Sequence, residues 1–137
     1  MKKLIFTLLV AVVLVGCQSK TVAGETVTVT GGSYQNITAA ELNTVLKSKD
    51  FTFVNVHIPF AGNIAATDLL IPYDQISTSE NLSQLPTNKS AKIVLYCRSG
   101  RMSAIAAEEL VSLGYTNIWN LDGGMDAWEK AGYPLEK

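Results

Sequence analysis

The sequence predicts an α/β domain in which a mainly parallel sheet of roughly five strands lies between two layers of helices. Three observations lead to this class. The chain has 137 residues, enough for one domain with a buried core. From residue 34 onward, strand-like and helix-like segments alternate. The clearest strand-like segments are largely apolar, as strands buried on both faces are, and the alternation implies right-handed crossovers between parallel strands.

The expected elements follow from local patterns. Thr38 and Glu41 have the spacing of a capping box, which predicts a short helix that ends at Lys47. Gly114 stands where a glycine commonly ends a helix. The other expected elements are strands at residues 26–30 (a weak signal), 51–56, 69–73, 92–97 and 116–121, and helices at 79–85, 103–113 and 123–132. The helix at 103–113 is expected to bury Ile105, Ala106, Leu110 and Leu113 and to expose Glu108 and Glu109.

The composition excludes two other classes of protein. Hydrophobic residues make up 47% of the chain and charged residues 17%, which excludes intrinsic disorder. The formal net charge is only −1, so no nucleic-acid partner is expected. We expect the protein to act as a monomer.

The first 17 residues, MKKLIFTLLVAVVLVGC, have the pattern of a secretory signal peptide. Their twelve uncharged residues span about 18 Å as a helix, too short for a hydrocarbon core of about 30 Å. The stretch from Leu14 to Cys17 resembles the lipobox of bacterial lipoproteins, in which the cysteine receives acyl chains such as palmitate. An ordinary cleaved signal peptide and an uncleaved anchor are the alternatives.

The lipobox implies a protein of the cell envelope, anchored by lipid on the extracytoplasmic side of a bacterial membrane. The expected organisation is a signal peptide at 1–16, a lipid-anchored tether at 17–32 and the domain at 33–137. Loss of Lys2 and Lys3 leaves nine basic against twelve acidic side chains, a formal charge of −3. An acylated Cys17 cannot form a disulfide, which leaves Cys97 as an odd thiol in an oxidising compartment. We expect evolution to replace such a cysteine unless its thiol has a function.

The segment YCRSGRMS, residues 96–103, places the only two arginines of the chain, Arg98 and Arg101, one and four residues after Cys97. The cysteine ends a predicted strand, at the sheet edge where ligand sites of parallel sheets lie. Gly100 lets backbone N–H groups turn inward, and the following helix start adds unpaired donors. These donors and the arginines favour a thiolate and would also hold an incoming anion. The alternative is a small buried cysteine that closes a core strand beside two solvated arginines.

The stretch YCRSGRMSAIAAEELVSLGYTNIWNLDGGMDAW, residues 96–128, resembles the active-site half of rhodanese-like sulfurtransferases. The resemblance implies a rhodanese-like domain in which Cys97 accepts a sulfane sulfur as a persulfide and passes it to a thiol or to cyanide. It implies that this persulfide is held by the loop residues Arg98, Ser99, Gly100, Arg101, Met102 and Ser103. No metal or organic cofactor is needed. Related loops with arginine or lysine go with thiosulfate, so a small sulfur-containing anion is the expected donor.

The N-terminal half departs from the family pattern. Family members show Ile-Asp-Val-Arg at the end of the second strand, whereas this chain has Asn55 and His57 at the acidic and basic positions. We interpret Asn55 as a structural hydrogen-bonding residue. His57 either bonds only locally at a strand end or lines the pocket and adds a titratable charge near Cys97. The segment HIPFAG, residues 57–62, can also be aligned with the later His-Ile-Pro-Gly-Ala segment of the family.

Five other residues are considered for a role near the site. Met102 either lines an apolar mouth beside the thiol or packs at the helix start, and Trp119 and Trp128 are interpreted as core. Gly123 and Gly124 either permit the last loop to approach the site closely or only shape a turn.

Three classes of function follow. A sulfurtransferase is the first. A phosphatase or arsenate reductase is the second, but that class needs histidine before the cysteine and arginine six residues after it, where this chain has Tyr96 and Ser103. The third is a non-enzymatic sulfur carrier, redox sensor or binding module that uses the same loop, and it stays open.

Overall fold

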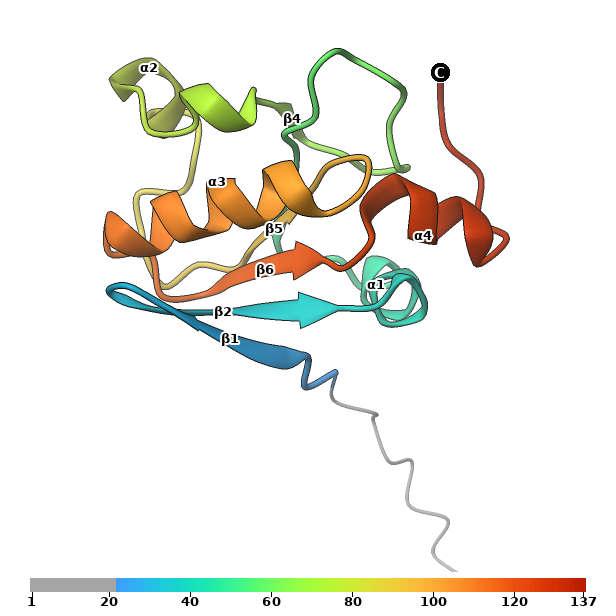
Figure 1. Ribbon diagram of the computed structural model, residues 1–137, viewed down its shortest axis with the longest axis horizontal. Coiled ribbons are helices and arrows are strands. Elements are labelled where there is room, and N and C mark those ends of the chain that lie inside the picture. Colours follow the sequence, from blue (N-terminus) through green and yellow to red (C-terminus); the bar gives the residue numbers. More distant parts are fainter. Residues whose placement is uncertain (1–21) are drawn as a thin grey trace, which may run out of the picture.

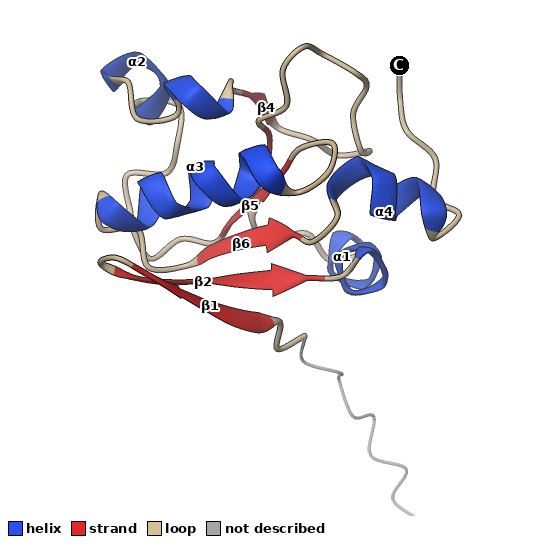
Figure 2. Ribbon diagram, in the orientation of Figure 1, coloured by secondary structure: helices blue, strands red, loops and turns tan. Residues whose placement is uncertain are grey.

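The computed structural model describes residues 22–137, so the predicted signal peptide and the lipidation site Cys17 lie outside the described residues. Figures 1 and 2 show one sheet with helices packed against it. Its strands are β1 (Glu25–Val29), β2 (Gly32–Ile37), β3 (Thr52–Asn55), β4 (Leu69–Leu70), β5 (Ile93–Tyr96) and β6 (Ile118–Leu121). Its helices are α1 (Ala39–Leu46), α2 (Ser79–Leu82), α3 (Arg101–Ser112), α4 (Gly124–Lys130) and the 3₁₀-helix η1 (Tyr73–Gln75).

The sheet has six strands in the order β1-β2-β6-β5-β3-β4, one more than the roughly five expected. Every pairing is parallel except the hairpin of β1 with β2. The prediction missed β2 because that strand is mostly polar and buries only Tyr34 and Ile37. The sheet also begins at Glu25, inside the range 17–32 expected to be a tether.

Helices cover both faces of the sheet, as predicted for a three-layer α/β domain. Neighbouring residues of a strand point to opposite faces. Accordingly, Val54 and Leu95 pack in one core cluster with α3, whereas Phe53 and Tyr96 pack in a second cluster with α1 and α4. These two cores hold the central strands β5 and β3 from both sides.

Two local predictions can be compared with the structure directly. The capping box of α1 is confirmed: the Glu41 N–H donates to Thr38 Oγ1 at 3.2 Å, and the Thr38 N–H donates to the Glu41 carboxylate at 2.8 Å. The prediction of Ile105 as a core residue is wrong, since 42% of its surface is exposed. α3 starts at Arg101, earlier than expected, and its buried face consists of Ser103, Ala106, Ala107, Leu110 and Val111. With 3.6 residues per turn, Ile105 lies on the opposite side of the helix from this face.

The carboxyl ends of the parallel strands share one edge of the sheet, toward which the β2 and β6 arrows point in Figure 1. Cys97 follows β5 at this edge, and the residues that follow β3 and β6 also lie there. No helix within residues 22–137 is long and apolar enough to cross a membrane.

Candidate active site

Cys97 lies at the centre of the domain, directly after β5, whose four residues are all buried between β3 and β6. The side chain is a free thiol and is 1% exposed. Burial shields the sulfur from bulk water, which strengthens its interactions with nearby hydrogen-bond donors. Burial alone is also typical of a purely structural cysteine. The groups around the sulfur therefore decide whether Cys97 is interpreted as a structural residue or as a nucleophile.

Two hydrogen-bond donors converge on the Cys97 sulfur. The Gly100 amide nitrogen lies 3.1 Å from Sγ, and the hydroxyl oxygen of the buried Ser103 lies 3.4 Å from it. The Ser103 hydroxyl has an alternative acceptor in the Gly100 carbonyl oxygen at 3.2 Å. Gly100 has a φ of 94°, in the left-handed region that glycine adopts without steric cost. Donors placed in this way stabilise negative charge on the sulfur, as predicted for a nucleophilic loop.

The first turn of α4 holds the carbonyl groups of the loop. The Met125 N–H donates to the Cys97 carbonyl and the Asp126 N–H to the Arg98 carbonyl, each at 2.9 Å. These amides are among those that have no partner within their own helix. A Cβ atom on Gly124 would lie 2.3 Å from the Cys97 carbonyl oxygen, so only glycine fits there. The glycine doublet therefore permits the close approach that was one of its two predicted roles.

The two arginines are exposed at the rim of the loop rather than packed against the sulfur. Arg98 Nε lies 3.5 Å from Asp126 Oδ1, and both side chains are more than half exposed. No carboxylate within residues 22–137 forms an ion pair with Arg101. Exposed charges attract an anion only weakly because salt screens them. The sequence carried no signal for the Arg98–Asp126 pair, since its partners belong to different elements.

Ser99 and Met102 complete the set of predicted loop residues. Ser99 is exposed, and Met102 is partly buried and packs against the core cluster that contains Cys97. Packing at the helix start, one of the two roles considered for Met102, is therefore what its side chain does. Contact of either residue with a substrate stays a prediction.

Asn55 has the structural role predicted for it. Its buried amide nitrogen donates to the Gly62 carbonyl at 3.0 Å and to Asn63 Oδ1 at 2.9 Å, and its Oδ1 accepts the His57 N–H at 3.0 Å. The Tyr96 hydroxyl adds a second attachment by accepting the Ile64 N–H at 3.0 Å. These side chains fasten the segment of residues 57–68 to the ends of β3 and β5.

His57 follows β3 at the same edge of the sheet as the loop, and its role as a pocket residue stays a prediction. The charged groups that shift its pKa are Arg98 of the loop and Asp126 of α4. Partial burial is the main cause that lowers the pKa of His57 below its usual value, the positive charge of Arg98 lowers it further, and Asp126 opposes both. Only the backbone N–H makes the local bond to Asn55, and the ring atom Nδ1 is buried without a partner in the described chain.

The residues that flank Cys97 do not form a phosphatase-type site. Tyr96 points to the opposite face of the sheet, where its ring packs on Phe53 at a centroid distance of 4.8 Å. Ser103 stands where that class requires arginine, and its hydroxyl approaches the sulfur instead. The geometry therefore offers no guanidinium for a tetrahedral oxyanion at this position.

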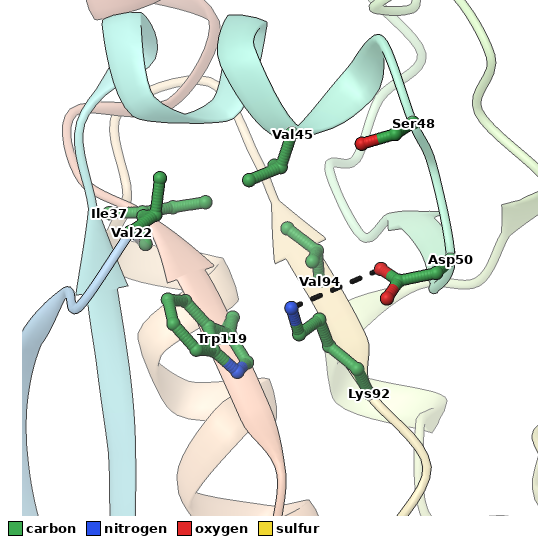
Figure 3. Close-up of a pocket in the computed structure, with 8 residues that line it drawn as sticks. All are labelled: Val22, Ile37, Val45, Ser48, Asp50, Lys92, Val94 and Trp119. Carbon is green, nitrogen blue, oxygen red and sulfur yellow. Dashed lines mark ion pairs between the residues drawn. The ribbon is translucent and has the colours of Figure 1, made fainter. Parts of the chain in front are cut away.

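A separate cavity of about 360 Å³ lies under α1, on the face away from α3. Figure 3 shows Val45 of α1 above Val94 and Trp119 of the sheet, with Lys92 and Asp50 at the rim. The two rim charges are 4.0 Å apart. Among residues 22–137, no cysteine or histidine lines this cavity, which is separate from the Cys97 loop. Trp128 is buried as predicted, whereas Trp119 is only partly buried because it lines the cavity.

Comparisons with known proteins agree with this geometry. The sequence model of the rhodanese-like domain family matches residues 45–131. The chain is 35% identical over 101 residues to a Mycobacterium tuberculosis protein named "Probable adenylyltransferase/sulfurtransferase MoeZ". The aligned region covers 72% of this chain but only 25% of that protein. It is 32% identical over 90 residues to a sulfurtransferase of Allochromatium vinosum, which covers 64% of this chain and 80% of the relative.

A solved structure shows the same fold. The crystal structure of a rhodanese-related protein from Thermoplasma volcanium superposes with a TM-score of 0.62 at 32% sequence identity. The match covers 74% of this chain and 97% of that one. Together with the family match, this similarity shows the rhodanese-like fold.

Proposed function

This chain belongs to the family of rhodanese-like domains, and we propose that it moves a sulfane sulfur from a small anionic donor to a thiol or to cyanide through a persulfide on Cys97. The single observation that carries the proposal is the convergence of the Gly100 N–H and the Ser103 hydroxyl on the Cys97 sulfur. A nucleophilic thiolate needs such donors, and a structural cysteine has no use for them.

The first step loads the cysteine. The Cys97 thiolate attacks the outer sulfur of thiosulfate, a bond forms between the two sulfurs, and sulfite leaves with the electron pair of the broken sulfur–sulfur bond. The enzyme then carries a persulfide anion. In the second step an acceptor attacks the terminal sulfur, and the electron pair of the breaking bond returns to Cys97 Sγ. The Gly100 amide and the Ser103 hydroxyl stabilise the charge on Sγ at the start and the end of this cycle.

Thiosulfate is the proposed donor because the rim of the loop is positively charged. Arg98 and Arg101 are both exposed there, and only Arg98 has a carboxylate neighbour within the described residues. A doubly charged anion is attracted more strongly than a singly charged one such as mercaptopyruvate. Because screening by salt weakens this attraction, the preference is expected to be modest at physiological ionic strength.

The cell envelope is the proposed location, with lipid on Cys17 as the anchor. The described chain starts at Val22 and enters the sheet at Glu25, which pairs with Asn36 near the carboxyl end of β2. This end of β2 lies at the same sheet edge as Cys97. The five residue steps from Cys17 to Val22 reach at most about 18 Å. An anchor at Cys17 would therefore keep the catalytic edge of the sheet close to the membrane.

The test is turnover and intact mass on the full chain extracted in detergent. Incubation with thiosulfate is expected to add the mass of one sulfur atom, and cyanide is expected to remove it as thiocyanate. The Cys97→Ser variant is the control and is expected to do neither. A sulfur adduct that no acceptor removes would indicate a sulfur carrier instead. Absence of any adduct, with several sulfur donors tried, would rule out the proposal and favour a binding role.

A further inference from the structure

His57 is the only histidine of the chain and lies at the edge of the sheet that carries the candidate site. Asn55, the last residue of β3, pairs with Tyr96, the last residue of β5, so the segments that carry His57 and Cys97 leave neighbouring strands at the same edge of the sheet. The ring is partly exposed, but Nδ1 is buried and has no hydrogen-bond partner within residues 22–137. Buried polar atoms without a partner are rare, and a catalytic role is one of their recognised explanations.

Partial burial, assisted by the charge of Arg98, favours the neutral ring of His57. Arg98 faces it from the loop and Asp126 from α4, and these two side chains also pair with each other at 3.5 Å. Burial and Arg98 lower the pKa of His57 from its usual value of 6.5, with Asp126 acting in the opposite direction. The imidazole is therefore uncharged at neutral pH, with one ring nitrogen free to accept a proton.

We propose that His57 is the base that takes the proton from an acceptor thiol as the sulfur leaves Cys97. This inference rests on the proposed function. The acceptor S–H proton moves to the imidazole, the acceptor sulfur bonds to the terminal sulfur of the persulfide, and the bond from that sulfur to Cys97 Sγ breaks. The electron pair of that bond stays on Sγ. The products are the persulfide anion of the acceptor, the Cys97 thiolate and an imidazolium that releases its proton to water.

The inference names the acceptor class as thiols that are still protonated at neutral pH. An ordinary thiol with a pKa of about 8.5 is roughly 3% thiolate at pH 7. A base in the site therefore increases the rate by at most about 30-fold, and the advantage disappears once the pH exceeds the pKa of the thiol. Sulfite in mildly alkaline buffer has no proton to lose, so as an acceptor it needs no base.

The experiment follows discharge of the persulfide in the full chain after loading with thiosulfate. Wild-type protein and His57→Gln are loaded, checked by intact mass and mixed with glutathione or sulfite. We expect equal loading. We expect His57→Gln to lose about tenfold in discharge rate to glutathione at pH 7 and less than about twofold near pH 9.5. Discharge to sulfite is expected to be equal in the two proteins.

Several outcomes would overturn the inference. Equal rates to glutathione at pH 7 would remove the role of His57, and an equal loss with both acceptors at every pH would indicate only a structural contribution. Failure of the wild type itself to load would refute the proposed function, and with it the role assigned to His57.

A second measurement covers the case in which His57→Gln does not fold. Diethyl pyrocarbonate on the loaded wild-type protein can modify only one histidine. We expect this modification to slow discharge to glutathione and to leave discharge to sulfite unchanged. Unchanged discharge to glutathione after complete modification would contradict the inference.

Discussion

The two walls of the candidate site are built in different ways. The loop wall, residues 97–103, is held by backbone groups: the Gly100 amide faces the sulfur, and the α4 amides take the loop carbonyls. The histidine wall, residues 55–68, depends on side chains as well, namely the Asn55 amide and the Tyr96 hydroxyl, beside a backbone bridge between Asn63 and Glu136. Hydrogen bonds made by backbone groups persist when side chains are substituted. Hydrogen bonds made by a side chain are lost when that residue is substituted. The sequence resembles its family in the first wall and departs from it in the second.

The largest effect is expected from Gly124→Ala, which breaks the support of the loop wall. Gly124 has a φ of 56°, and a Cβ there would collide with the Cys97 and Arg98 carbonyls. The left-handed conformation and the overlap together are expected to cost on the order of 3 kcal/mol and to abolish sulfur loading. Urea unfolding measures the loss. The matched control is Gly132→Ala, where φ is 90° but no atom lies within 4 Å, so only about 1 kcal/mol should be lost.

Asn55→Asp tests whether the histidine wall needs an amide. The Asn55 amide nitrogen donates to two oxygen atoms, the Gly62 carbonyl and Asn63 Oδ1. A carboxylate would place a third acceptor against them in a buried site, which is expected to cost roughly 2 kcal/mol at pH 7. Because a protonated carboxyl group can donate again, the loss should shrink as the pH falls. A variant as stable as the wild type at pH 7 would contradict this account.

Ser103→Ala removes one of the two donors to the Cys97 sulfur. Hydrogen bonds to charged groups contribute about 1.5–3 kcal/mol, so the rate of loading from thiosulfate should fall by roughly 10-fold or more. Single-turnover mass spectrometry measures this rate, and alkylation of the thiol by iodoacetamide reports its reactivity independently. Ser99→Ala is the comparison, because Ser99 is exposed on the same loop. If both serine variants load at the wild-type rate, Ser103 does not stabilise the thiolate.

The smallest expected effect comes from Arg98→Gln, which tests the coupling between the two walls. Arg98 lowers the pKa of His57 and Asp126 raises it, so removal of the guanidinium raises that pKa. His57 would then become protonated at a higher pH, and discharge to glutathione should begin to fall at a higher pH than in the wild type. We expect only a small upward shift of the profile, because Arg98 is exposed. The pH profile of Arg101→Gln should not move.

Whether a contact could be predicted from the sequence depended on how far apart its two residues lie along the chain. The capping box of Thr38 and Glu41 and the interaction of Gly100 with Cys97 join residues three apart, and both were predicted. The strand β2 was missed because its polar residues resemble a loop until β1 and β6 pair with it. The role of the Tyr96 hydroxyl was missed because its partner Ile64 is 32 residues away along the chain.

The sequence by itself indicated Cys97 as the candidate nucleophile, and it specified the loop that follows this residue and the layered α/β class. Periodicity, capping and glycine conformation act over a few neighbouring residues, so the order of residues alone is enough to specify them. Only the tertiary structure decided that α4 supports the loop and that His57 faces Arg98 and Asp126. These contacts arise where the ends of parallel strands meet at one edge of the sheet, and pairing of distant segments sets that geometry.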